Sequence, residues 1–179
     1  MNTEHILDLL AAHTSRFDEE RLFLKWTAQF VQQHPDEWWQ RRLLVGHLTG
    51  SAWVLHPDGE QALLVHHINL DKWVQPGGHA DTEDVVLLQT ARREAQEESG
   101  IIRLRALSEE IFDLDVHVIP AKRDVPEHLH YDVRFLFQAE EAALQADPAE
   151  VKGARWVPIR EMRVSPSLQQ SVRRMAMKI

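Results

Sequence analysis

Cysteine is absent from this chain of 179 residues, which excludes disulfides, zinc–thiolate sites and thiol nucleophiles. Long apolar runs are also missing: no stretch approaches the roughly 18 uninterrupted apolar residues that indicate a membrane span. The first residues, Met1–His5, lack the basic start and apolar core of a secretory signal. We therefore expect a cytoplasmic protein without a membrane partner.

Positive charge is scarce, with 20 Lys and Arg against 28 Asp and Glu and a formal net charge of −8. This balance argues against binding to nucleic-acid polymers or anionic membranes. A small phosphorylated substrate stays compatible with it, provided that a cation and a few local arginines neutralise the phosphates. Hydrophobic residues make up 44% of the chain, which is normal for one globular domain with a real core.

Residues 1–40 are predicted to form an N-terminal helical extension. Apolar residues follow a helical period from Ile6 to His13, and a second helix is expected to begin at Asp18 and to end near His34-Pro35. We interpret the two helices as a packing extension anchored by Trp38-Trp39. They are also a candidate contact surface for a second copy of the chain, in a homodimer.

Residues 41–179 are predicted to form the main domain, where strands and helices mix. Pro57-Asp58-Gly59 is a strong turn signal between two apolar runs, which predicts a hairpin. Asp81 or Thr82 is the expected cap of the next helix, and Gly100 its C-terminal stop. Together the runs predict an α/β sandwich with a mixed sheet. The expected strands are 43–55, 61–67, 73–75, 111–119, 129–137 and 154–158, and the expected helices are 83–99 and 167–177.

Three carboxylates stand out on the helix expected at 83–99. Glu94, Glu97 and Glu98 lie at i, i+3 and i+4, which puts all three on one helical face. Like charges at this spacing destabilise an isolated helix by a few tenths of a kcal/mol per pair. A hard divalent cation is the obvious reason to gather them, because carboxylate oxygens are its preferred ligands.

The segment around these carboxylates resembles the Nudix box. In that family a glycine is followed by five residues, a glutamate, seven residues, Arg-Glu, an aliphatic, any residue, Glu-Glu, any residue, glycine and an aliphatic. The run from Arg93 to Ile101 matches every fixed position of the second half. The first half departs: counted from Gly78, the acidic slot holds Asp84, and eight residues instead of seven precede Arg93. The resemblance implies a Nudix-type α/β/α sandwich.

The resemblance also implies a function and a set of site residues. Nudix hydrolases use Mg²⁺ or Mn²⁺ to attack a diphosphate with water, commonly one linked to a nucleoside. By resemblance, Glu94, Glu97 and Glu98 would hold the metal, together with the backbone carbonyl of Gly77. Arg93 lies four residues before Glu97, so a salt bridge is expected to fix that carboxylate. The general base stays open among Glu94, Glu97, Glu127, His128 and Glu150.

Substrate contacts are expected from two places. His79 follows the Gly-Gly loop and could contact a phosphate or simply shape the loop. The stripe of His128, His130, Asp132 and Arg134 on one face of the strand at 129–137 is typical of a solvated strand face, but it could instead line the substrate cleft. The sequence alone disfavours a His/Asp zinc site there.

Two other functions deserve comparison. An isomerase of the same fold, acting on isopentenyl diphosphate, would require a catalytic cysteine, and the chain has none. A catalytically silent nucleotide-binding or sensor module of the Nudix fold is the other alternative, although such proteins usually lose box carboxylates and all three are present here. Subfamily signatures for coenzyme A, NADH or dinucleoside polyphosphates are not apparent, so the diphosphate substrate stays open.

Overall fold

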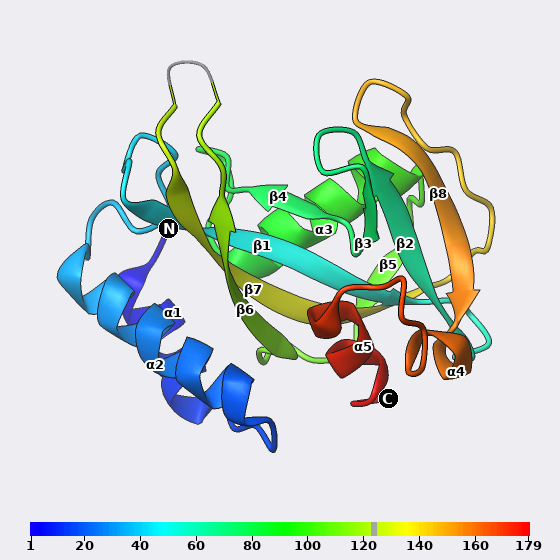
Figure 1. Ribbon diagram of the computed structural model, residues 1–179, viewed down its shortest axis with the longest axis horizontal. Helices are drawn as coiled ribbons and strands as arrows, with labels where there is room; N and C mark the ends of the chain where they lie inside the picture. The colour runs from blue at the N-terminus through cyan, green and yellow to red at the C-terminus, as the bar shows by residue number, and fades with distance from the viewer. Residues whose placement is uncertain (123–124) are drawn as a thin grey trace.

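The structure is a computed structural model that describes residues 1–122 and 125–179 (Figure 1). Its described part is built on an eight-stranded mixed sheet in which β3, β2, β1, β7 and β5 lie side by side in that order. β4 pairs with β1, β6 with β7, and β8 with β2. The strands are β1 (Gly46–Leu55), β2 (Gln61–His67), β3 (Lys72–Val74), β4 (Gly77–His79), β5 (Leu104–Ala106), β6 (Asp113–Ile119), β7 (His128–Ala139) and β8 (Val151–Pro158).

The central pair of the sheet is parallel and joins segments far apart in the chain. β1 and β7 run in register from Gly46 opposite Leu129 to Leu55 opposite Gln138. The β1–β4 and β6–β7 pairs are antiparallel. Because paired residues point to the same face of a sheet, this register decides which side chains of β1, β4, β6 and β7 meet.

Helices cover the sheet on either side, so the predicted α/β/α sandwich is confirmed (Figure 1). Helix α3 packs against β1 at Gly50, where the absence of a side chain lets the two backbones approach. A Cβ at Gly50 would lie 2.8 Å from the carbonyl oxygen of Leu87. No described helix is long and apolar enough to cross a membrane. The helices are α1 (Thr3–Ala12), α2 (Asp18–Gln33), α3 (Leu87–Ser99), α4 (Ile159–Met162) and α5 (Gln170–Ala176).

The start of α3 corrects the sequence prediction. The helix begins at Leu87 rather than near residue 83, its N-cap is Val86, and no side chain caps it. Asp84 instead accepts a hydrogen bond from the Asp81 amide at 3.0 Å, which holds the preceding residues in a turn. The predicted C-terminal stop is confirmed, because Gly100 adopts the left-handed conformation with φ 74°.

The N-terminal helices pack on the body of the molecule. Phe30 of α2 stacks on Tyr131 of β7 with 4.3 Å between ring centroids. Trp38 is buried in the core that β1 and β7 share, in agreement with the predicted anchor, and its indole N–H donates to Thr3 Oγ1 of α1 at 3.0 Å. The two helices expected within residues 1–40 are therefore confirmed, and they belong to the same apolar core as β1 and β7.

Buried charges join α2, β6 and α5. Arg174 of α5 donates to Asp113 of β6 at 2.9 Å and to Glu19 of α2 at 2.7 Å. Glu20 of α2 is fully buried and accepts from Lys178 at 2.6 Å. The closing helix predicted over 167–177 is shorter than expected, and the ion pairs of Arg174 fix it against α2 and β6.

Candidate active site

The Gly77-Gly78 loop, which begins strand β4, brings its backbone unusually close to two side chains. A Cβ on Gly77 would collide with Ser51 of β1, and a Cβ on Gly78 would lie 2.5 Å from the Glu94 carboxyl carbon. Only glycine leaves room for these contacts. Along β4, Gly77 and His79 therefore face the side of Ser51, whereas Gly78 faces Glu94.

Glu94 and Glu98 lie at this loop, and Glu97, on the same helical face, is joined to Glu94 through Arg93. Glu98 is buried, with 6% of its surface exposed, and accepts a hydrogen bond from the Gly77 amide at 3.0 Å. Glu94 lies over Gly78 and is largely shielded, whereas the side chain of Glu97 is half-exposed. The buried end of the cluster is thus closed by the loop and the other end is open to solvent.

Arg93 holds the cluster together through four acceptors. Its guanidinium donates to Glu94 at 2.9 Å and to Glu97 at 3.0 Å, so the predicted salt bridge with Glu97 is confirmed. It also donates to the His79 carbonyl at 2.8 Å and to Asp84 at 3.0 Å. These bonds lock the rotamers of two box carboxylates and connect α3 to β4.

Asp84 contacts Arg93 despite the extra residue in the box. Its carboxylate also accepts from the Thr90 hydroxyl at 2.9 Å and from the Asp81 amide at 3.0 Å. Burial on its own would raise the pKa of Asp84, but the Asp81 amide, Arg93 and Thr90 outweigh it and lower the pKa. Asp84 is therefore a charged carboxylate that positions Arg93.

The negative charges of the box carboxylates are crowded and partly buried, which favours a bound cation. Burial, and then the negative charges of Glu94, Glu150 and Glu97, raise the pKa of Glu98 to about 8 in spite of the Gly77 hydrogen bond. Burial also raises the pKa of Glu94, against the opposing effect of Arg93. Such crowded, desolvated oxygens are costly as anions unless a cation neutralises them. An all-oxygen donor set of this kind fits Mg²⁺ or Mn²⁺.

The general-base candidates separate in space. Glu150, in the turn before β8, is close enough to raise the pKa values of both Glu94 and Glu98. His128 instead lies at the start of β7, with its ring 5.2 Å from that of His47 between centroids. Glu127 precedes it in the chain. Glu150 is therefore the downstream candidate whose charge acts on the box carboxylates.

The side chains expected to contact substrate divide into two groups. His79, His128 and His130 gather around His47, a residue that sequence reasoning missed. Arg134 differs from the expectation: it is buried, and it donates to Asp132, Asp113 and Asp115 at 2.7, 3.0 and 3.2 Å. All three of its donor nitrogens are engaged with carboxylates, so at Asp132 and Arg134 the stripe is buried and is neither a solvated face nor a cleft wall.

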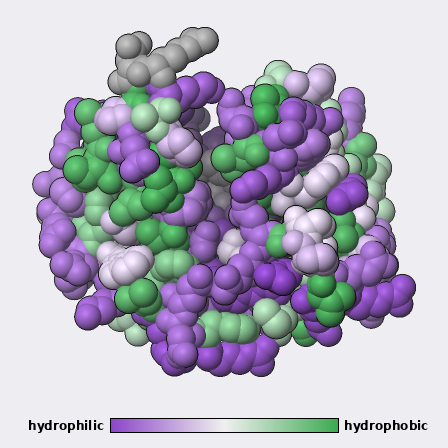
Figure 2. Space-filling model, in the orientation of Figure 1, coloured by the Kyte–Doolittle hydropathy of each residue, from purple (hydrophilic) through white to green (hydrophobic). Residues whose placement is uncertain are grey.

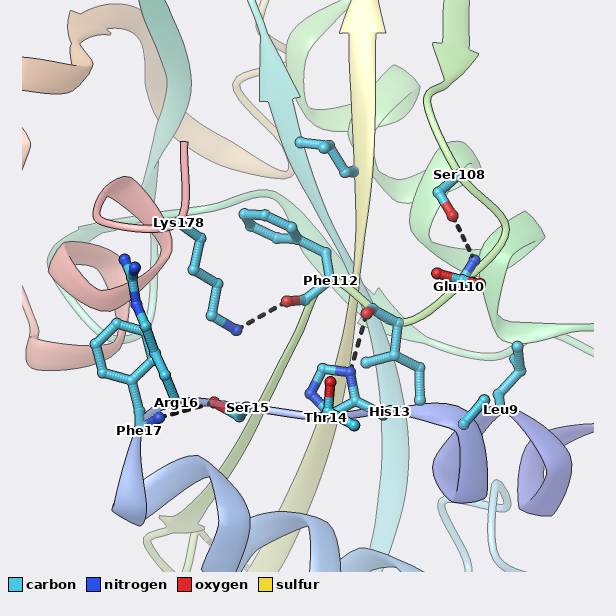
Figure 3. Close-up of a pocket in the computed structure, with 13 residues that line it drawn as sticks. Leu9, His13, Thr14, Ser15, Arg16, Phe17, Ser108, Glu110, Phe112 and Lys178 are labelled. Atoms are coloured by element: carbon cyan, nitrogen blue, oxygen red, sulfur yellow. Dashed lines mark hydrogen bonds between the residues drawn. The ribbon is translucent and has the colours of Figure 1, made fainter.

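Hollows occur in several parts of the described structure. Figure 2 shows the viewed face hollowed between the β6–β7 hairpin and the side of the molecule that carries β2 and β3. A cavity of about 460 Å³ lies elsewhere, between the α1–α2 connection, the segment before β6 and the C-terminus (Figure 3). His13, Ser15 and Lys178 line it, and no lining residue comes from the Gly77–Ile101 segment. We do not assign the diphosphate chemistry to that cavity.

Comparison with known proteins agrees with this geometry. The NUDIX domain family matches residues 47–178, which is well over half of the chain. The protein therefore belongs to the Nudix family, and the resemblance drawn from the box is confirmed. No curated protein matches the chain.

Solved structures with the same fold are distant in sequence. A NUDIX-family hydrolase from Clostridium perfringens is 20% identical with a TM-score of 0.56, over 74% of this chain and 94% of that one. An Ap4A hydrolase from C. elegans, in a binary complex, is 17% identical with a TM-score of 0.56, over 73% and 93%. The NUDIX domain of Shewanella oneidensis NrtR, in complex with ADP-ribose, is 20% identical with a TM-score of 0.56, over 82% and 96%. At these identities the likeness shows the fold alone.

Proposed function

We propose that this protein is a Mg²⁺- or Mn²⁺-dependent hydrolase that splits the diphosphate bond of a small molecule, such as a nucleoside diphosphate linked to another group. The observation that best supports the proposal is the position of Glu94 and Glu98 against the Gly77-Gly78 loop, with Arg93 bonded to both Glu94 and Glu97 on the same helical face. In this proposal the three carboxylates and the Gly77 carbonyl hold the metal.

A bound divalent cation would supply charge neutralisation for the diphosphate oxygens and would lower the pKa of water. The chain's own residues do the remaining work. Glu98, desolvated beneath the loop, offers a fixed carboxylate at the closed end of the site. Arg93 keeps Glu94 and Glu97 in place, so that little reorganisation is needed during turnover. Asp84 keeps Arg93 in place.

A proton must leave the attacking water, and three carboxylates are suited to accept it. Glu97 is half-exposed and held at one oxygen by Arg93, which leaves its other oxygen for a water. Glu94 and Glu150 are the other candidates, since Glu150 acts electrostatically on Glu94. Proton transfer to a positioned carboxylate is typically worth 10²–10⁴-fold in rate.

The substrate class is a diphosphate, and the moiety attached to it stays open. Structural relatives include an Ap4A hydrolase and a domain bound to ADP-ribose, so dinucleoside polyphosphates and ADP-ribose belong in a first substrate panel beside nucleoside triphosphates. Of the side chains that the sequence offers for substrate contact, His79 and His130 lie with His47 on the face of β4 opposite Glu94, so they are not part of this proposal. A homodimer through the N-terminal helices stays a prediction, and light scattering on the purified protein checks it.

The alternative is a nucleotide-binding module without activity. The ADP-ribose complex of the NrtR domain favours binding, whereas the intact Arg93–Glu97 pair favours catalysis. Tight binding of a panel member without product in Mg²⁺ or Mn²⁺ would support the sensor.

The residue-level test is Glu97→Gln. We expect this variant to lose metal-dependent turnover by at least about 100-fold, because a neutral amide neither binds a hard cation well nor accepts a proton. Circular dichroism and thermal unfolding should match the unmodified protein, since Glu97 is half-exposed. Glu109→Gln, an exposed glutamate outside the box, is the matched control. Wild-type turnover in Glu97→Gln would remove Glu97 from the mechanism.

A further inference from the structure

Three histidines from three neighbouring strands face one another on the side of β4 away from Glu94. His47 of β1 pairs in register with His130 of β7, and Thr49, two residues along β1, pairs with His79 of β4. Their ring centroids are 4.8 Å apart for His47–His130, 5.0 Å for His47–His79 and 4.9 Å for His79–His130. The three rings therefore form a nearly equilateral triangle.

We propose that His47, His79 and His130 form a binding site for a divalent transition-metal ion, with Zn²⁺ as the ion that fits best. The ligand nitrogens of the three residues all lie within 4.8 Å of one another. Imidazole nitrogens at 2.0–2.1 Å from a tetrahedral ion are separated by roughly 3.3 Å, with ring centroids roughly 5 Å apart. The Nε2 atoms of His79 and His130 are 3.3 Å apart and share a hydrogen bond, which the ion would replace.

His47 supplies an independent observation. It is 2% exposed, and neither ring nitrogen makes a hydrogen bond of normal geometry with the described residues. Burial lowers the pKa of His47, and the nearby Leu43 carbonyl opposes this lowering only in part. The contact with that carbonyl does not have the geometry of a hydrogen bond. A buried polar group left unpaired costs about 1–3 kcal/mol. A metal ion would give one His47 nitrogen a partner.

The surroundings of the cluster suit a metal better than a phosphate. His47 is buried, and His79 and His130 are half-buried against it and each other. Imidazole binds a metal ion through the lone pair of its neutral form.

His128 is a candidate for a fourth ligand. Its Nδ1 lies 2.9 Å from the Pro126 carbonyl, which can only accept, so Nδ1 carries the proton and Nε2 keeps a lone pair. Its ring is 5.2 Å from those of His47 and His130 between centroids. His79, His128 and His130 are partly exposed, which gives an ion a path from solvent.

This site is chemically distinct from the carboxylates and does not depend on the proposed hydrolysis. Nitrogen donors select borderline ions such as Zn²⁺, whereas Mg²⁺ prefers oxygen. The two sites are nevertheless adjacent, since His79 is the residue after Gly78 and its carbonyl accepts from Arg93. An ion here would link β1, β4 and β7 beside the loop that holds Glu98.

The test measures Zn²⁺ binding by the full chain after a chelator has removed bound metal. Excess Mg²⁺ is present so that it occupies the oxygen sites. We expect one equivalent of Zn²⁺ to survive dialysis. Co²⁺ in its place should show the strong visible bands of a four-coordinate nitrogen site. His79→Gln and His130→Gln, at partly exposed positions, should each weaken binding by at least about 100-fold. His5→Gln on α1 is the matched control and should bind as the unmodified chain does.

Each contrary result overturns the site. Failure of the unmodified chain to retain Zn²⁺, or weak six-coordinate Co²⁺ bands, would contradict it without reference to any variant. Unchanged affinity in His79→Gln and His130→Gln would exclude these rings as ligands. If the two variants raised KM for a diphosphate while the unmodified chain bound no Zn²⁺, the rings would be substrate contacts instead.

Discussion

At the scale of single residues, Arg93 is the side chain on which the proposed chemistry most depends. It contacts Glu94, Glu97, Asp84 and the His79 carbonyl, so one guanidinium fixes both the helix face and β4. A planar fork with several donors can do this, whereas a lysine ammonium offers a single point of charge.

Arg93→Lys is therefore expected to lower kcat by about 100-fold, because displacement of catalytic groups by about 1 Å can cost that much. KM should change less, since the positive charge stays. Steady-state kinetics with the best panel substrate provides the measurement. Arg92→Lys is the matched control, because the neighbouring Arg92 lies over the Phe137 ring and not in the carboxylate cluster. Equal losses in both variants would contradict a special role for Arg93.

Gly78 sets the approach of the loop to Glu94. In Gly78→Ala the new methyl would lie 2.5 Å from the Glu94 carboxyl carbon, so this flexible side chain must swing away. We expect turnover to fall by about 100-fold while the melting temperature changes little. Gly153→Ala is the control, since a Cβ there meets nothing within 4 Å. Full activity in Gly78→Ala would show that the position of Glu94 is not critical.

At the scale of elements, buried charge rather than apolar contact alone docks α5 and α2. Arg174 is almost fully buried between Asp113 of β6 and Glu19 of α2. Replacing one partner of such a group leaves the remaining charges uncompensated, which is the costly case for buried ion pairs.

Arg174→Met is expected to destabilise the fold by about 3–5 kcal/mol. Urea unfolding followed by circular dichroism measures the change. Arg160→Met, at an exposed position of the neighbouring helix α4, should stay within about 0.5 kcal/mol of the unmodified protein. A small effect in Arg174→Met would mean that apolar packing holds α5 by itself.

Glu20 makes the docking of α2 sensitive to acid. Burial would raise its pKa, but hydrogen bonds from His13, Lys178 and Ser15 outweigh burial and lower the pKa from 4.5 to about 2. Because the folded-state pKa is depressed, the stabilisation is complete above pH 4.5 and is lost as the pH falls toward 2.

Glu20→Gln should therefore be less stable than the unmodified protein at pH 7, and the difference should shrink between pH 4.5 and 2. Urea midpoints across this range measure it, with the exposed Glu4→Gln as control. A difference that stays constant with pH would show that the charge of Glu20 does not stabilise the docking.

At the scale of the whole molecule, local patterns predicted most elements and the helix face that carries Glu94, Glu97 and Glu98. The hairpin strand 61–67, the stop at Gly100 and the clustering of Glu94, Glu97 and Glu98 depend on turn chemistry and helical period, which are properties of neighbouring residues. The Arg93–Glu97 pair was predictable for the same reason.

Features that depend on non-local pairing were not predictable. The parallel register of β1 with β7 places His47 beside His130, and nothing near His47 in the chain indicates it. The same pairing buries Asp132, whose carboxylate accepts from Ser51 at 2.7 Å and from Arg134 at 2.7 Å. Alternation along one strand left a solvated face or a cleft wall open there, because it cannot show that other strands bring opposite charges to it.

The most direct test of the proposed function is hydrolysis of the diphosphate panel in ¹⁸O-labelled water, followed by ³¹P NMR. We predict that one phosphoryl product of at least one substrate gains a single ¹⁸O, that chelation of the divalent metal stops the reaction, and that Glu97→Gln stops it as well. Release of no labelled product from any panel member with Mg²⁺ or Mn²⁺, or turnover that survives both chelation and Glu97→Gln, would contradict a carboxylate-held metal as the centre of this protein's chemistry.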